Sequence, residues 1–148
     1  MSGSLRRIAA IGMGIAALAF AGCGGSSEET LTKAQFVEQA NKICRAGENK
    51  RAKRVNELLE EQASKKPSAK PKDDIIFDVI AIYEETTGEL SELGKPEGEE
   101  EKVDAIVEAM EEAADRVHAN PQSALTGDLP FRKANKLAED YGLDSCDT

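Results

Sequence analysis

Apolar residues recur at intervals of three and four along four segments of this chain, and this pattern constrains the fold more than any other feature. Such spacing places apolar side chains on one face of an α-helix, whereas a half-buried strand alternates apolar and polar residues. The pattern predicts helices over about 33–63, 73–93 and 99–117, and a fourth that begins near Pro130 and ends before Gly142. We therefore expect an all-α single domain resembling a four-helix bundle.

The first helix has a clear start and a weak middle. Thr32 and Gln35 have the spacing of a capping box, and prolines in the segment 65–72 forbid regular helix there. Gly47 lies in a stretch, 45–54, whose only apolar residues are small, so the pattern allows a bend or break there. The residues predicted to face the core are Phe36, Ala40, Ile43, Cys44, Val55, Leu58 and Leu59.

The second helix competes with a strand. The stretch 75–83, IIFDVIAIY, is rich in isoleucine and valine, which favour strands. Helix is the preferred interpretation because spacings of three and four continue through 84–93. Asp73 and Asp74 would also suit the positive end of a helix dipole.

The N-terminal segment has the organisation of an export signal. Arg6 and Arg7 precede an uncharged run, 8–22, of 15 residues that ends in small residues. A bilayer span needs about 20 apolar residues, so a secretory signal peptide is the preferred interpretation. A retained membrane anchor is the alternative.

The order Phe20-Ala21-Gly22-Cys23 resembles the lipobox of bacterial lipoproteins, although that family most often has leucine where Phe20 stands. The resemblance implies cleavage of residues 1–22, attachment of lipid to the Cys23 thiol and a location on the outer face of the cell membrane. Two or more acyl chains hold a protein stably on a bilayer. Residues 23–31 would then be a lipidated flexible tether, and 32–148 the helical domain.

Three cysteines are present, and lipidation of Cys23 leaves Cys44 and Cys146. An exported protein meets an oxidising environment, so we expect these two to form a disulfide. A closed loop of about 100 residues stabilises a fold by about 4–5 kcal/mol in the chain-entropy model. A two-thiolate metal site is the alternative, but it lacks neighbouring ligands to complete tetrahedral zinc coordination.

The stretches LTKAQFVEQANKIC and YGLDSC also resemble a group of small exported helical proteins from actinobacteria, often lipoproteins without an assigned function. The resemblance is confined to the two ends of the domain and implies the same disulfide and helices, but no activity. The matching residues are Phe36, Cys44, Tyr141, Gly142, Leu143 and Cys146.

Charge is unevenly distributed along this acidic chain of formal net charge −9. Residues 42–72 contain 10 Lys or Arg and 4 Asp or Glu, whereas 73–118 contain 3 and 16. The basic stretch would either lie beside the acidic helices, which is the preferred interpretation, or face an anionic surface. Its candidate surface residues are Arg45, Lys50, Arg51, Lys53 and Arg54.

No residue pattern indicates catalysis or a cofactor. The single histidine, His118, sits where a helix is expected to end, a position that favours a cation. The acidic run 97–104 lacks the ligand spacing of an EF-hand loop, so we expect no metal site there. A nucleic-acid partner is not expected, given the export signal and the acidic total.

The sequence thus predicts a membrane-anchored, non-catalytic lipoprotein that acts as a protein-interaction or scaffolding module, with an envelope protein or an anionic surface as partner. The alternative is a small-ligand carrier with a pocket inside the helical bundle. The two differ in what they require: an exposed apolar patch rimmed by charge for the first, and an enclosed cavity for the second.

Overall fold

The computed structural model describes residues 30–64, 72–125 and 130–147, and the regular secondary structure in these ranges is helical. The prediction of an all-α fold is confirmed, and so is the preferred helical interpretation of 75–83, because these residues lie within one α-helix. The elements are α1 (Lys33–Ser64), α2 (Lys72–Ser91), α3 (Glu100–Ala119), the 3-10 turn η1 (Pro121–Leu125) and α4 (Arg132–Tyr141).

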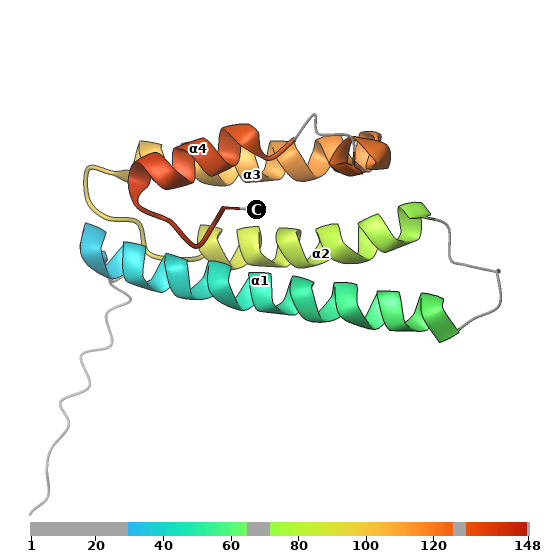
Figure 1. Cartoon of the computed structure of the whole chain (residues 1–148). Helices are drawn as coiled ribbons and strands as arrows, with labels where there is room; N and C mark the ends of the chain where they lie inside the picture. The colour runs from blue at the N-terminus through green and yellow to red at the C-terminus, as the bar shows by residue number, and fades with distance from the viewer. Residues whose placement is uncertain (1–29, 65–71, 126–129, 148) are drawn as a thin grey trace, which may run out of the picture.

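The four helices pack in two layers (Figure 1). α1 and α2 run antiparallel in one layer, α3 and α4 lie in the other, and the segment after α4 turns back toward α1. η1 packs against α2 and α3. α1 has 32 residues and α4 only 10, which correspond to about 48 Å and 15 Å of helix. α1 therefore extends well past α4.

The predicted capping box starts α1. The backbone N–H of Thr32 donates to Oε1 of Gln35 over 2.9 Å, and the N–H of Gln35 donates to Oγ1 of Thr32 over 3.3 Å. These reciprocal bonds satisfy donors that a helix start otherwise leaves free. Leu31, just before the cap, packs against the buried cluster that contains Phe36.

One buried cluster joins all four helices and the C-terminal segment. Two aromatic pairs lie within it or at its edge: Phe36 meets Tyr141 edge-on at 5.9 Å between ring centroids, and Tyr83 meets Phe131 at 5.0 Å. Small side chains fill much of the remaining interface, which lets helix backbones approach closely. The buried alanines are Ala40, Ala109, Ala113, Ala114, Ala134 and Ala138.

The helix does not break at Gly47, because α1 is continuous from Lys33 to Ser64. The glycine serves packing instead. A Cβ built at Gly47 would lie 2.2 Å from Oγ1 of Thr86 on α2, far inside van der Waals contact. Glycine is needed at this position because the two helices cross closely there.

The predicted apolar face of α1 is only partly buried. Phe36, Cys44 and Leu58 are buried as expected, but Val55 is 39% exposed and Leu59 is 59% exposed. Helical spacing places Val55 and Leu59 near the side of α1 that carries Cys44. It does not show whether another element covers that side along its whole length. The prediction that Val55 and Leu59 belong to the core is therefore wrong.

The last helix begins two residues after Pro130 and ends just before Gly142, as expected. Pro130 and Phe131 form a turn before α4, and the N–H of Asn135 already donates to the Phe131 carbonyl over 2.9 Å. At the other end Gly142 adopts φ +101°, the left-handed region. The N–H of Leu143 donates back to the Ala138 carbonyl over 2.8 Å, which is the pattern of a Schellman cap.

Within the described ranges, none of the helices is both long and apolar enough to cross a membrane. The proposed signal peptide, 1–22, and most of the tether, 23–31, lie outside the described residues.

Candidate functional site

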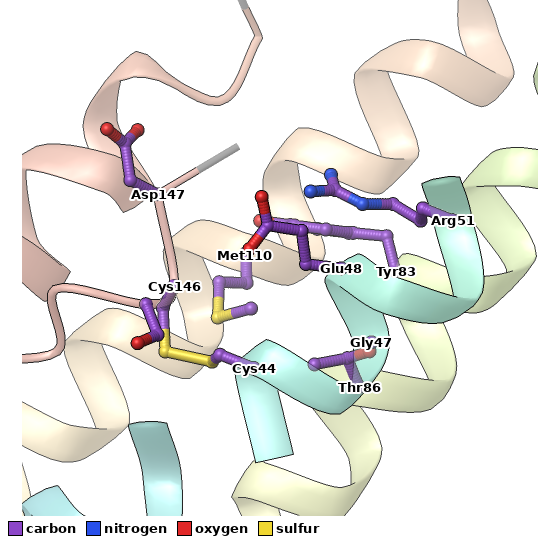
Figure 2. Close-up of a pocket in the computed structure, with 10 residues that line it drawn as sticks. Cys44, Gly47, Glu48, Arg51, Tyr83, Thr86, Met110, Cys146 and Asp147 are labelled. Carbon is purple, nitrogen blue, oxygen red and sulfur yellow. A yellow bond between two sulfur atoms is a disulfide. The ribbon is translucent and has the colours of Figure 1, made fainter. Parts of the chain in front are cut away.

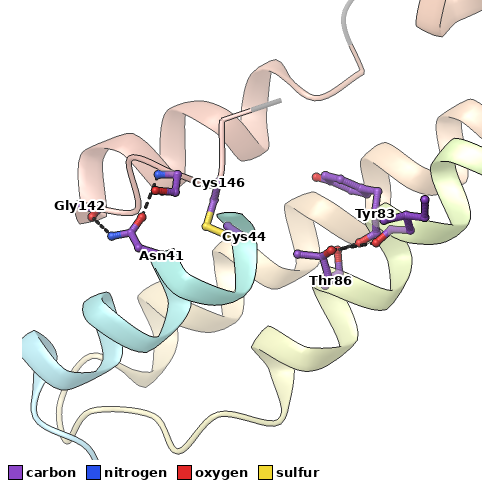
Figure 3. Close-up of a disulfide and its surroundings, with 9 residues drawn as sticks. Asn41, Cys44, Tyr83, Thr86, Gly142 and Cys146 are labelled. Atoms are coloured by element: carbon purple, nitrogen blue, oxygen red, sulfur yellow. Dashed lines mark hydrogen bonds between the residues drawn. A yellow bond between two sulfur atoms is a disulfide. The ribbon is translucent and has the colours of Figure 1, made fainter. Parts of the chain in front are cut away.

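The predicted disulfide is present and fixes the C-terminal segment to α1. Cys44 and Cys146 are bonded, both are buried, and their Cα atoms are 4.9 Å apart. Asn41, one turn before Cys44, donates from Nδ2 to the Gly142 carbonyl over 3.1 Å and accepts from the Ser145 N–H over 2.8 Å (Figure 3). A covalent bond and two hydrogen bonds thus hold one end of the chain against the other, a structural role for both cysteines.

A small hollow lies beside this disulfide, between α1, α2, α3 and the C-terminal segment (Figure 2). Its volume is about 20 Å³, which is room for little more than one water molecule. The Tyr83 side chain lines it, and within the described residues its buried hydroxyl has no hydrogen-bond partner. Burial raises the pKa of Tyr83 well above its ordinary value, although the Arg51 charge opposes this. The hollow is too small for an organic ligand.

Of the five basic candidates on α1, two are paired with acidic residues of α2. Lys50 Nζ lies 2.7 Å from Glu85 Oε1, and Arg54 Nη2 lies 2.6 Å from Asp78 Oδ2. The hydrogen bond to Glu85 raises the pKa of Lys50. These contacts join the basic helix to the acidic one, as the preferred interpretation of the charge pattern expects.

The other three candidates point in different directions. Arg51 is half-buried and lines the disulfide hollow, whereas Arg45 and Lys53 are exposed. Lys53 lies 3.8 Å from Glu57 on the next turn. The five residues therefore do not converge on one basic surface.

A basic cluster that the sequence analysis missed lies between α3 and α4. Arg116 near the end of α3 and three residues of α4 surround an open hollow of about 520 Å³, which we call the α3–α4 hollow. Its lining is Arg116, Pro130, Arg132, Lys133, Lys136, Leu137 and Asp140. The dense run FRKANK at 131–136 was the available signal, but only packing brings Arg116 beside it.

Two carboxylates pair with cations of this cluster. Glu112 of α3 lies 2.9 Å from Lys133 Nζ and 3.9 Å from Arg116 Nη2, and Asp140 lies 3.1 Å from Lys136 Nζ. Hydrogen bonding to Lys133, and then the charges of Lys133 and Arg116, lower the pKa of Glu112. Glu112 is therefore ionised at neutral pH and links the two helices.

The exposed part of α1 forms a second feature of interest. Val55 follows Cys44 by 11 residues, close to three helical turns, so both side chains leave α1 on nearly the same side. Around Cys44 the C-terminal segment covers that side, but α1 continues beyond α4 with Val55 and Leu59 exposed. We call this region, around Val55 and Leu59, the open side of α1.

Residues with potential chemistry have structural contacts instead. His118 Nε2 lies 2.9 Å from Glu84 Oε1, and its ring stacks on Phe77 at 5.5 Å. In the part of the chain that the structure describes, no three His, Cys, Asp or Glu side chains are grouped so as to hold a metal ion. Cys23, the predicted lipidation site, lies outside that part.

Comparison with known proteins adds no further assignment: no family model matches the chain, and no match was found among curated proteins or solved structures.

Proposed function

We propose that this chain is a lipid-anchored lipoprotein of the cell envelope whose helical bundle acts as a non-catalytic protein-interaction or scaffolding module. The observation that carries the proposal is the open side of α1, where Leu59 is 59% exposed and Val55 is 39% exposed. Isolated apolar residues are common on protein surfaces. Two large apolar residues on successive turns of one helix side have the spacing through which helices bind protein partners.

Charged side chains border this apolar pair. Glu48 and Arg51 lie on the preceding turns of the same helix side, and Glu60 follows Leu59. Interfaces commonly have an apolar centre with a polar rim, which keeps the free surface soluble. The open side of α1 therefore suits a protein partner that contributes apolar side chains of its own.

The position of this surface also favours a protein partner over the membrane itself. The tether would enter α1 at Lys33, and Leu59 follows 26 residues later, which is about 39 Å along the helix. A chain anchored through Cys23 would carry the open side of α1 at the end of the helix far from the anchor. Such a surface is suited to reach another envelope protein.

The alternative, a small-ligand carrier, gains no support from the hollow beside the disulfide. That hollow holds about 20 Å³, whereas sites for organic ligands occupy about 300–1,000 Å³. The alanine-rich contacts between the helices use the interior for close packing instead.

Site-specific photo-crosslinking in intact cells tests the proposal. A photoreactive amino acid placed at Leu59 of the anchored chain should give one discrete crosslinked product of higher mass. The matched control is the same amino acid at Lys53, an exposed position elsewhere on α1, which should give none. Equal products from both positions, or none from Leu59, would contradict the assignment of this surface.

A further inference from the structure

We propose that the α3–α4 hollow binds a phosphate group, carried either on a small soluble molecule such as a glycerol phosphate or on a lipid headgroup. This site is distinct from the open side of α1 and does not depend on it. The proposal rests on the convergence of four cations, on their incomplete neutralisation, and on a charge order in α4 that does not serve the helix itself.

The four cations converge from two helices. Arg116 comes from α3, whereas Arg132, Lys133 and Lys136 come from α4, and all line one hollow. With a volume of about 520 Å³ the hollow exceeds a bare phosphate and can admit a short attached chain. Arginine offers paired N–H donors that match two phosphate oxygens, and lysine adds a point charge.

Neutralisation of this cluster is incomplete. Glu112 forms ion pairs with both Lys133 and Arg116, and Asp140 forms one with Lys136. Two carboxylates thus face four cations, and among the described residues Arg132 has no acidic partner. The Lys136 and Arg116 side chains are 71% and 60% exposed, so both can still turn toward a ligand.

The charges of α4 run against its own dipole. The helix begins with Arg132 and Lys133, has no acid in its first turn, and ends with Glu139 and Asp140. A helix is stabilised by acids at its start and bases at its end, so this order weakens α4. It does, however, concentrate positive potential at the hollow, which a bound anion would use.

The positive charge at the α3–α4 hollow stands out against the rest of the molecule. The chain has a formal net charge of −9, and Lys50 and Arg54 of the basic α1 face acids of α2. A focused basic hollow on an acidic protein attracts a small or multiply charged anion, whereas a broad basic face would bind polyanions without selectivity. Leu137 and Pro130 provide apolar contact for the carbon chain of such a ligand.

The test uses the exported, disulfide-bonded chain in a neutral detergent, labelled with ¹⁵N. Glycerol phosphate is titrated in one arm, and micelles doped with phosphatidylglycerol or with phosphatidylcholine are compared in the other. The amide signals of Arg132 and Lys136 should shift and saturate. Saturation by free glycerol phosphate identifies a soluble ligand, and a response to phosphatidylglycerol alone identifies a headgroup. No saturable shift in either arm would overturn the proposal.

A charge-matched pair of variants separates this site from a general charge effect. Arg132→Gln with Lys136→Gln should weaken binding about tenfold or more, since charge-assisted contacts are lost. Arg45→Gln with Lys53→Gln removes the same charge from exposed positions on α1 and should leave binding within about twofold. Equal losses in the two variants would contradict the site. The thermal midpoint of the α4 variant should change little, because loss of the unfavourable Arg132 charge from the first turn offsets loss of the exposed Lys136–Asp140 pair.

Discussion

Gly47 of α1 lies against Thr86 of α2 so closely that a Cβ at position 47 would meet Oγ1 of Thr86 at 2.2 Å. The threonine hydroxyl is itself held, since it donates to the Ile82 carbonyl over 2.8 Å. This contact sets the separation of the first two helices near the level of the disulfide, to which Cys44 contributes from the preceding turn.

Replacing Gly47 with alanine should therefore destabilise the fold. Helix propensity alone would favour alanine by about 1 kcal/mol, but overpacking costs about 1–3 kcal/mol, so we expect a net loss of about 1–2 kcal/mol in urea unfolding. Gly88→Ala is the matched control, because a Cβ there meets nothing within 4 Å. It should raise stability by up to about 1 kcal/mol. Adding Thr86→Ala to Gly47→Ala should recover most of the loss, and additive losses would contradict the contact.

Removal of the disulfide should have the largest effect of any single change. Cys44 and Cys146 are 102 residues apart in the sequence. For a closed loop of that length the chain-entropy model gives a stabilisation of the fold of about 4–5 kcal/mol. Cys44→Ala with Cys146→Ala should lower the unfolding midpoint sharply, and a reducing agent should lower the unmodified chain to a similar value. The double variant itself should be insensitive to the reductant. Unreduced exported protein with two free thiols would contradict the bridge.

The burial of the Tyr83 hydroxyl should make the fold less stable in alkali. Burial holds the pKa of its hydroxyl above the ordinary value, which is about 10 in an unfolded chain. The unfolded state then releases the proton first, so the free energy of unfolding should fall as pH rises above about 10. Tyr83→Phe should lack this component and be neutral or slightly stabilising at neutral pH, since the hydroxyl has no partner among the described residues. Parallel pH profiles for the two proteins would contradict this account.

The lipid anchor is tested at Cys23. Metabolic labelling with a radioactive fatty acid should mark the unmodified chain, and Cys23→Ser should abolish the label because the acyl chains need the thiol and the cleavage it directs. Cys146→Ser serves as the control, since that cysteine lies in the disulfide and not at the proposed anchor. Label retained in Cys23→Ser would refute lipidation at this residue.

Local signals in the sequence predicted the features that depend on neighbouring residues. Thr32 and Gln35 form the capping box because both lie in one turn. Gly142 ends α4 because glycine itself adopts the left-handed conformation, whatever packs around it. The pairing of Cys44 with Cys146 followed from elimination and compartment, without knowledge of the packing.

Features that depend on how helices meet could not be predicted. The need for glycine at Gly47 arises from the register of α1 against α2. Val55 and Leu59 have core spacing, but their exposure depends on which elements pack against that end of α1. Arg116 and Arg132 are 16 residues apart and share a hollow because α3 packs on α4.

Hydroxyl-radical footprinting of the anchored chain on intact cells, compared with the isolated chain, tests the central claim most directly. In the isolated protein Leu59 and Leu125 should both be oxidised readily, because they are 59% and 60% exposed. On cells, a partner on the open side of α1 should protect Leu59 several-fold while Leu125 stays reactive. Equal oxidation of Leu59 in the two preparations would contradict an interaction through this surface.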